Sequence, residues 1–473
     1  MSLGVSIWGD GRVLVGGSPW KVSTLGPAAR DLVLRLRAAG AAGIPVQAPR
    51  DRAALRVLLD RGFAECAPGS PARASLADVE IIVPVLDDPE RLRELLATLP
   101  ADRVVVVDDG STDPEATAAA ATAAGARILR HAVNLGPAAA RNTGVRHTTA
   151  PLVAFIDADC LADTSWPTGL LRHFDDPAVA AAAPRIAPHV EGSSILERYE
   201  VTRSSLDMGG QPELVRPGAR LAFVPSAALV VRRAAMQPGG FDEDLRLGED
   251  VDLAWRLAES GWLVRYDPSV SVRHRTRSRL RSWLRRKMEY GTSVPALEAR
   301  HPGNLSPARP SVWSVITFVL IAMGHPVAGT AVQAVPRALL ARRFERLPNG
   351  GSLAARVAVQ GMVGDAVGIG QALRREWWPI GAVFLVASPR SRVARVGALL
   401  MLAPLAMEWA QRRPLVDPIS YAALRLLDDA AYGTGVLMSS RRARTWATIL
   451  PRIAGPQLPR RPRSTVRRLV RVS

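Results

Sequence analysis

The chain has 473 residues, of which 48% are hydrophobic, and it carries a formal net charge of +18. This length suffices for two or three domains, and the positive charge favours nucleic acid, nucleoside diphosphates or an anionic lipid surface as partners. The two cysteines, Cys66 and Cys160, make no metal-ligand or disulfide pattern and are expected to be reduced core thiols. The first eleven residues lack a basic region followed by a long apolar stretch, so a cleaved secretory signal is not expected.

Residues 1–75 are expected to form a small α+β, winged-helix-like module. The expected elements are strands at 13–15 and 20–22, on either side of a Gly-Gly-Ser-Pro turn, and helices near 27–39 and 50–61. A Pro-, Gly-, Ser- and Ala-rich stretch at 67–75 is typical of a linker. The module is too short to be an enzyme, so we expect it to serve recognition or docking.

Residues 76–290 alternate strands and helices. The expected strands lie at 79–85, 103–107, 126–129 and 152–156, and the expected helices at 89–98, 114–124 and 137–146. This order predicts an α/β fold with a doubly wound, mostly parallel sheet. In such sheets ligands bind beyond the carboxyl ends of the strands, so functional side chains are expected there.

Acidic residues follow the first two of these strands. Val83-Pro84-Val85 precedes Leu86-Asp87-Asp88, and the second strand ends in Asp108-Asp109-Gly110-Ser111. A carboxylate at this edge can accept a hydrogen bond from a nucleotide base or a ribose hydroxyl. The alternative is a solvated Asp-Gly turn between strand and helix.

The fourth strand ends in Asp157-Ala158-Asp159. Positions i and i+2 of an extended chain share one side, so both carboxylates can converge on a Mg²⁺ or Mn²⁺ ion that bridges a diphosphate. His274 ends a later β-like run and is a candidate third metal ligand. The alternatives are a polar turn for the aspartates and a structural role for the histidine.

Two further charged groups are candidates for the chemistry. Glu249 and Asp250 open an amphipathic helix, where the helix dipole favours ionised carboxylates, and an ionised carboxylate can act as a general base. An ordinary acidic first turn is the alternative. Arg141 lies one turn inside a helix that begins at Pro137, so it can reach a phosphate or a base.

Residues 291–473 differ in character from the rest. Residues 310–336 hold no formally charged side chain and predict either one membrane span or a buried helical hairpin broken at Pro326. The apolar runs at 357–373, 377–387 and 396–407 are shorter and suit re-entrant or interfacial helices. Ten arginines and no acidic residue follow Asp429. Membrane association is expected, with a soluble helical cap as the alternative.

The motifs resemble, in their order, the family 2 inverting glycosyltransferases of the GT-A fold: strand-PV, DDGS, NLGPAAARN, DAD, GED and a strand-terminal His. The resemblance implies that Asp109 contacts the nucleotide base and that Asp157 and Asp159 hold ribose and metal. It implies a catalytic base from the Glu249–Asp250 pair, normally at the position of Asp250. The donor-binding residues so implied are Pro84, Asp109, Gly136, Arg141 and Asp157, and the metal ligands are Asp157, Asp159 and His274.

A longer resemblance covers the whole layout. The segment GGSPWKVSTLGPAAR is similar to the small peptide-binding module of the pyrroloquinoline quinone pathway, and RRKMEYGTSVPALEARHP and AAYGTGV resemble the glycosyltransferase family of the mycofactocin system. That resemblance implies transfer of glucose from UDP-glucose to a peptide-derived redox cofactor precursor, building a β-linked oligosaccharide. It further implies a divalent metal, no nucleic acid, and attachment to the cytoplasmic face of the cell membrane.

Some residues depart from the family pattern. PVLDD stands where most family 2 enzymes have PVYN, which leaves the role of Asp87 open. The Q-x-x-R-W signature of processive polysaccharide synthases is absent, which argues against that branch. Two alternatives remain: transfer to a lipid or cell-wall acceptor, and a basic nucleic-acid-binding or scaffold protein. The scaffold hypothesis leaves the three acidic motifs unexplained.

Overall fold

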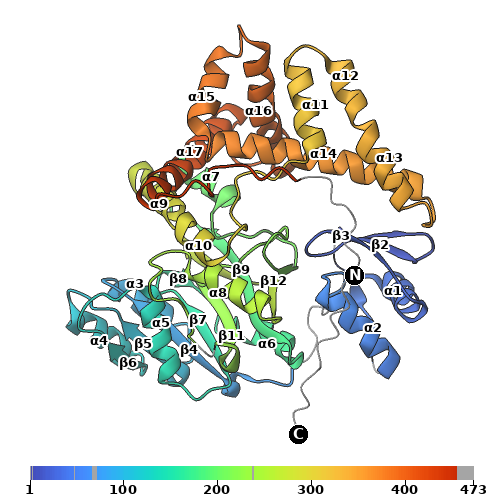
Figure 1. Ribbon diagram of the computed structural model, residues 1–473. Helices are drawn as coiled ribbons and strands as arrows, with labels where there is room; N and C mark the ends of the chain where they lie inside the picture. The colour runs from blue at the N-terminus through green and yellow to red at the C-terminus, as the bar shows by residue number, and fades with distance from the viewer. Residues whose placement is uncertain (1, 3, 47, 66–71, 237–238, 455–473) are drawn as a thin grey trace. The chain divides into compact units, whose positions relative to one another are not determined.

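The computed structural model describes residues 2, 4–46, 48–65, 72–236 and 239–454 (Figure 1). By packing, the chain forms two units. Unit 1 comprises the described parts of Met1–Leu305, Arg346–Gly350 and Leu405–Thr448, and unit 2 those of Ser306–Glu345, Gly351–Pro404 and Ile449–Ser473. The chain thus leaves unit 1 after the central sheet of that unit is complete, and it returns to unit 1 near the end.

The N-terminal module of unit 1 is a three-stranded antiparallel sheet with two main helices. Its elements are β1 (Ser6–Trp8), β2 (Val13–Gly16), β3 (Lys21–Thr24), α1 (Pro27–Ala39), the 3₁₀ turn η1 (Gly40–Ala42) and α2 (Pro49–Asp60). Both helices open with proline, whose fixed φ suits the first helical turn. The core is made by Leu14, Leu32, Leu58 and Phe63, all fully buried. The sequence missed β1 because three residues are too few to show a period.

The central sheet of unit 1 is mixed, with the order β10-β12-β9-β11-β7-β4-β5-β6. Its strands are β4 (Val79–Val85), β5 (Val104–Asp108), β6 (Arg127–Arg130), β7 (Leu152–Ile156), β8 (Cys160–Leu161, paired with β12), β9 (Val179–His189), β10 (Glu213–Val215), β11 (Ala228–Arg232) and β12 (Leu263–Arg275). β6, β5, β4 and β7 are parallel. β11 runs antiparallel to both β7 and β9, and β9 and β12 are parallel to each other. The predicted doubly wound, mostly parallel architecture is confirmed.

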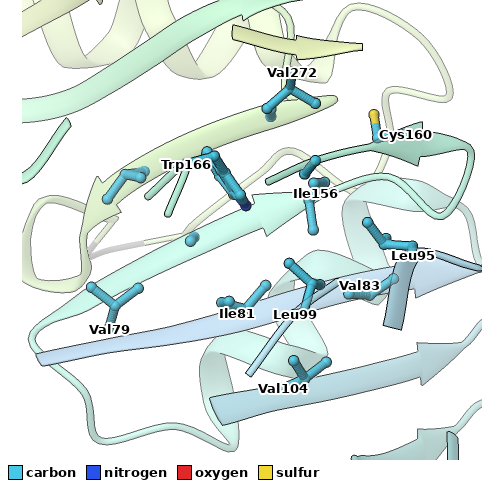
Figure 2. Close-up of a cluster of buried hydrophobic side chains, with 14 of the residues drawn as sticks. Val79, Ile81, Val83, Leu95, Leu99, Val104, Ile156, Cys160, Trp166 and Val272 are labelled. Atoms are coloured by element: carbon cyan, nitrogen blue, oxygen red, sulfur yellow. The ribbon is translucent and has the colours of Figure 1, made fainter. Parts of the chain in front are cut away.

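Helices cover both faces of this sheet. They are α3 (Pro89–Leu96), α4 (Pro114–Ala123), α5 (Pro137–Arg146), α6 (Thr168–Leu171), α7 (Ile195–Arg203) and α8 (Glu249–Glu259). Alternate residues of the strands point to opposite faces of the sheet and pack into two separate hydrophobic cores. One includes Val79, Ile81 and Val83 (Figure 2), and the other Ile82, Val105 and Phe155. Cys160 is a buried free thiol of the first core, as expected, whereas Cys66 lies outside the described residues.

The last helices of unit 1 are α9 (Leu280–Thr292), α10 (Val294–Arg300) and α17 (Pro418–Arg442). α9 and α17 touch backbone to backbone, because a Cβ on Gly435 would lie 1.9 Å from the carbonyl oxygen of Met288. Beside this crossing, Tyr199 meets Trp283 edge to face with ring centroids 5.9 Å apart. The close glycine contact fixes where α17 lies against α9.

Unit 2 is helical. Its helices are α11 (Val312–Ala322), α12 (Pro326–Val332), α13 (Ala334–Arg343), most of α14 (Gly350–Arg374), α15 (Trp378–Ala387) and most of α16 (Arg392–Arg412). Of the two predictions for residues 310–336, the hairpin broken at Pro326 is observed, with Thr317 Oγ1 donating to the Gly329 carbonyl at 3.0 Å across it. It is not buried as predicted, since Val319 and Val327 are 50% and 81% exposed. Among the described helices, α16 alone is long and apolar enough to cross a membrane by length and composition, while α11 and α15 are shorter apolar helices.

Candidate active site

The carboxyl ends of β4, β5, β6 and β7 meet at one edge of the sheet. Register pairs Val85 with Asp108 and Asp108 with Arg130, so the segments after these strands are neighbours. Asp87, Asp109, His131 and Asp157 all lie in those segments. The edge predicted to bind ligand therefore does gather the acidic motifs; we call it the donor edge.

Asp109 organises the loop that leads into α5. Its Oδ1 accepts from Leu135 N at 3.0 Å and its Oδ2 from Gly136 N at 2.8 Å, and His131 Nδ1 lies 2.7 Å from Oδ1. Gly136 adopts φ +103°, a backbone conformation that favours glycine. Asp109, predicted to contact a nucleotide base, thus also holds the backbone of the segment that would face it.

His131 is a residue that sequence reasoning missed. Its Nε2 lies 2.8 Å from Thr143 Oγ1 on α5, so the ring links that helix to Asp109. The available signal was its place: it directly follows the third parallel strand, where the rule for strand ends already predicted functional side chains.

Asp87 ties the loop after β4 to the loop after β5. It adopts φ +54°, and its Oδ1 accepts from Thr112 N at 2.7 Å and from Thr112 Oγ1 at 2.8 Å. These hydrogen bonds hold the pKa of Asp87 below its usual value. Asp87 therefore has a structural role in joining the two loops. Pro84 lies in β4 opposite Val107, one step before this loop.

Arg141 is the centre of the donor edge. It is 3% exposed, and its guanidinium donates to Asp157 Oδ1 at 2.6 Å through Nη2 and to Glu249 Oε1 at 2.9 Å through Nη1. The group also lies 5.5 Å from the centroid of the Phe241 ring, while its Nε has no hydrogen-bond partner. One arginine thus joins the DAD and GED motifs, which are far apart in sequence.

Asp250 lies in the first turn of α8, beside this arginine cluster. Its oxygens accept from Val251 N at 2.8 Å and Ser226 N at 3.3 Å. Burial and the neighbouring charge of Glu249 raise the pKa of Asp250 to about 7. The expectation that the helix dipole keeps this group ionised was wrong in direction, because desolvation and like-charge repulsion outweigh the dipole and the two amide hydrogen bonds. A carboxylate with a pKa near neutrality is well suited to accept a proton at working pH.

The three predicted metal ligands are only partly brought together. His274 Nε2 lies 3.2 Å from Asp159 Oδ1 because β12 pairs His274 with Cys160 in β8. Burial lowers the pKa of His274, but the hydrogen bond and charge of Asp159 outweigh it, and the pKa is raised. Asp157 is held by Arg141 instead, and the described residues contain no cluster of three or more His, Cys, Asp or Glu side chains set to hold a metal. The imidazole–carboxylate pair still offers donor types that suit a divalent ion.

Polar contacts behind the site hold α5 and α8 in place. Asn142 Nδ2 donates to the Phe241 carbonyl at 2.8 Å and its Oδ1 accepts from Phe241 N at 2.9 Å. On α8, His301 Nε2 lies 3.0 Å from Asp252 Oδ1, and both residues are buried. These contacts were not predicted, because the partners are far apart in sequence.

The known proteins that this chain resembles settle its family. Residues 80–236 match the family model described as Glycosyl transferase family 2. Over 462 residues, the chain is 36% identical to the pre-mycofactocin glycosyltransferase of Mycobacterium tuberculosis, which covers 95% of this chain and 96% of that protein. This chain belongs to the pre-mycofactocin glycosyltransferase family. With the sheet described above, it is a family 2 glycosyltransferase of the GT-A fold.

More distant likenesses cover a smaller share of the chain. The succinoglycan biosynthesis protein ExoU of Rhizobium meliloti is 31% identical over 208 residues, which is 40% of this chain and 59% of that protein. Among solved structures, the mannosyltransferase PcManGT from Pyrobaculum calidifontis in complex with GDP-Man and Mn²⁺ is 19% identical, with a TM-score of 0.37, and covers 71% of this chain and 98% of that chain.

Proposed function

We propose that this glycosyltransferase moves glucose from UDP-glucose to the peptide-derived mycofactocin precursor, with inversion at the anomeric carbon, and builds a β-linked oligosaccharide. The observation that carries the acceptor is the 36% identity over 95% of the chain to the pre-mycofactocin glycosyltransferase. The observation that carries the reaction is the meeting of Arg141, Glu249 and Asp250 at the donor edge.

The proposed step needs one base and one counter-charge. Asp250 takes the proton of an acceptor hydroxyl, whose oxygen forms a bond to the anomeric carbon while the bond from that carbon to the diphosphate oxygen breaks on the opposite face. Arg141 neutralises part of the charge on the departing diphosphate, and Glu249 holds the guanidinium in place at 2.9 Å. The partly buried site strengthens both effects because the local dielectric is low.

A divalent metal, Mg²⁺ or Mn²⁺, is part of the proposal. Asp159 and His274, whose side chains already touch, would hold it, with Asp157 as the further candidate. When bound, such an ion neutralises diphosphate charge. We assign the contact with the nucleotide base of the donor to Asp109 and to the backbone around Gly136. Pro84 borders this contact.

Acceptor mass tests the proposal directly. The full chain is incubated with the precursor, a divalent metal and each of UDP-glucose, UDP-galactose, GDP-mannose and GDP-glucose. We expect the acceptor to gain hexose units with UDP-glucose, and not with Asp250→Asn. Transfer to a polyprenyl phosphate but not to the precursor would instead support the lipid-acceptor alternative.

We also propose that unit 2 attaches the protein to the cytoplasmic face of the cell membrane through the tips of two helical hairpins. One tip lies between α11 and α12, and the other between α15 and α16. The tips are adjacent, because a Cβ on Gly324 would lie 2.7 Å from Arg392 Nη1. They expose Val327 (81%) and Val386 (79%), beside the cations of Arg390 and Arg392. Exposed apolar groups next to arginines suit the boundary between acyl chains and anionic headgroups.

Vesicle binding tests this attachment. We expect Val327→Asp/Val386→Asp to lower co-sedimentation with phosphatidylglycerol vesicles several-fold, because two charges would enter the acyl boundary. Val57→Asp, on an exposed position of α2, is the matched control. Equal sedimentation of the double variant and wild type would contradict the proposal.

A further inference from the structure

Unit 1 contains a second concave site, away from the donor edge. A cavity of about 600 Å³ lies between the N-terminal module and the central sheet. The module contributes Lys21 on β3, and Arg56, Asp60 and Arg61 at the end of α2. The sheet domain contributes Asp176–Ala178, Arg216, Gly261 and Leu263. We call this site the cationic cleft.

The charges in the cationic cleft do not balance. Arg56 is paired, since it binds Asp176 at 2.7 Å and also contacts Asp60. Lys21, Arg61 and Arg216 have no side-chain hydrogen bond or ion pair anywhere in the described part of the chain. The Nε of Arg216 is fully buried and lacks a hydrogen-bond partner.

This arrangement is unfavourable for the empty protein. Burial, together with the charges of Arg61 and Arg216, lowers the pKa of Lys21. Burial lowers the pKa of Arg216 as well. A solvated basic face would show neither effect, because its side chains would stay in water and apart. A concave cluster of mutually repelling, partly desolvated cations is what an anion would stabilise.

The strand register separates the cleft from the donor edge. β9 and β12 run in the same direction as β7, since β11 is antiparallel to both β7 and β9. The cleft lies at the amino ends of β9 and β12, whereas Asp157 follows the carboxyl end of β7. Val230 pairs with both Ala154 and Ala182, so the two sites are about 20 Å apart along the strands at ~3.3 Å per residue. The cleft is therefore not part of the diphosphate site.

We propose that the cationic cleft is a binding site for an oxyanion, a carboxylate or a phosphate, held by Lys21 and Arg61 from the module and by Arg216 from the sheet domain. Guanidinium groups match the planar oxygens of a carboxylate and the tetrahedral oxygens of a phosphate, and the ammonium adds a point charge. The bound anion joins the two domains. Ser18 Oγ, which donates to the Leu214 carbonyl at 2.5 Å, already ties them together nearby.

Chemical acylation of lysine can report almost specifically on the cationic cleft. Lys21 and Lys287 are the only lysines of the chain, and Lys287 is 5% exposed and hydrogen-bonded to Ser205 at 2.6 Å. Acylation by an amine reagent at mildly alkaline pH, read by peptide mass spectrometry, therefore reports Lys21. A bound oxyanion covers the amine and favours its charged form, so acylation slows.

We expect inorganic phosphate to slow Lys21 acylation at least threefold relative to sodium chloride of equal ionic strength. Arg61→Gln/Arg216→Gln is expected to lose this protection, whereas Arg52→Gln/Arg198→Gln, which removes two exposed arginines, keeps it. Arg216→Gln alone is the milder variant should the double variant fold poorly, and acylated Lys287 marks unfolded protein. Equal protection by chloride, or full protection in the cleft variants, would overturn the proposal.

A second arm identifies the source of the anion, and this arm rests on the proposed function. A short peptide with a free C-terminal carboxylate is compared with its C-terminal amide. Protection by the acid alone assigns the cleft to an acceptor carboxylate, and protection by phosphate but by neither peptide assigns it to a free phosphate. Because acylation needs no sugar transfer, this result is distinguishable from a failure of the proposed activity.

Discussion

The donor edge and the cationic cleft lie at opposite edges of the same sheet, the first at the carboxyl ends of β4–β7 and the second at the amino ends of β9 and β12, and they differ in how their charges are paired. At the donor edge, Arg141 is shared by Asp157 and Glu249, and Asp109 is bound by two backbone amides. In the cleft, three cations face one cavity without partners among the described residues. The paired charges of the donor edge stabilise the protein without a ligand. The unpaired cations of the cleft destabilise it until an anion binds.

The largest effect is expected from Asp250→Asn. Removing the proposed base should lower kcat about 10²- to 10⁴-fold, because an amide cannot accept the acceptor proton. The nucleoside diphosphate should bind with unchanged affinity by calorimetry. The control is Asp244→Asn, an exposed acid two residues after Asp242. Near-normal turnover by Asp250→Asn would show that another residue is the catalytic base, and it would weaken the contrast between the two sites.

Arg141→Gln should show what compensation contributes to stability. Two carboxylates would lose their shared cation, which costs about 3–5 kcal/mol when a buried ion pair is broken from one side. The measurement is the free energy of unfolding in urea. Arg146→Gln, on the exposed side of the same helix, should change that free energy by less than about 0.5 kcal/mol. Similar losses in both variants would show that the Arg141 network adds no particular stability.

The pH dependence of transfer should follow Asp250. Its pKa is raised to about 7, so the basic form needed for catalysis is lost as pH falls through 7. Below this value kcat/KM should drop about tenfold per pH unit, and above about pH 8 it should level off. The residual activity of Asp250→Asn should lack this limb. A flat wild-type profile between pH 5 and 8 would argue that Asp250 does not titrate in the free enzyme.

The smallest effect, of opposite sign, is expected in the cationic cleft. Arg216→Gln removes one of the repelling cations, so in phosphate-free buffer the free energy of unfolding should stay the same or rise by up to about 1 kcal/mol. The gain should vanish when phosphate stabilises the wild type. A decrease of several kcal/mol in the free energy of unfolding would mean that the charge of Arg216 is compensated in the empty protein. The proposed contrast between the two sites would then be wrong.

Much of the donor edge was predictable because its signals are local. β4 (79–85), α5 (137–146) and β7 (152–156) were predicted with their observed bounds, since apolar runs and an N-terminal proline mark them clearly. The parallel-strand rule then placed Asp109 and Asp157 at one edge. The resemblance to family 2 glycosyltransferases supplied the roles of Pro84, Gly136, Asp159 and His274, which remain predictions.

By itself, then, the sequence determined the alternation of strands and helices, the family, and the edge of the sheet that carries the acidic motifs. Only the tertiary structure decided that Arg141 joins Asp157 to Glu249, that Asp250 titrates near neutrality, and that β3, α2 and the segment after β10 bring Lys21, Arg61 and Arg216 to one cavity. The reason is physical. Hydrophobic period and capping act within a few residues, whereas desolvation and charge–charge interactions depend on which distant segments the fold brings together.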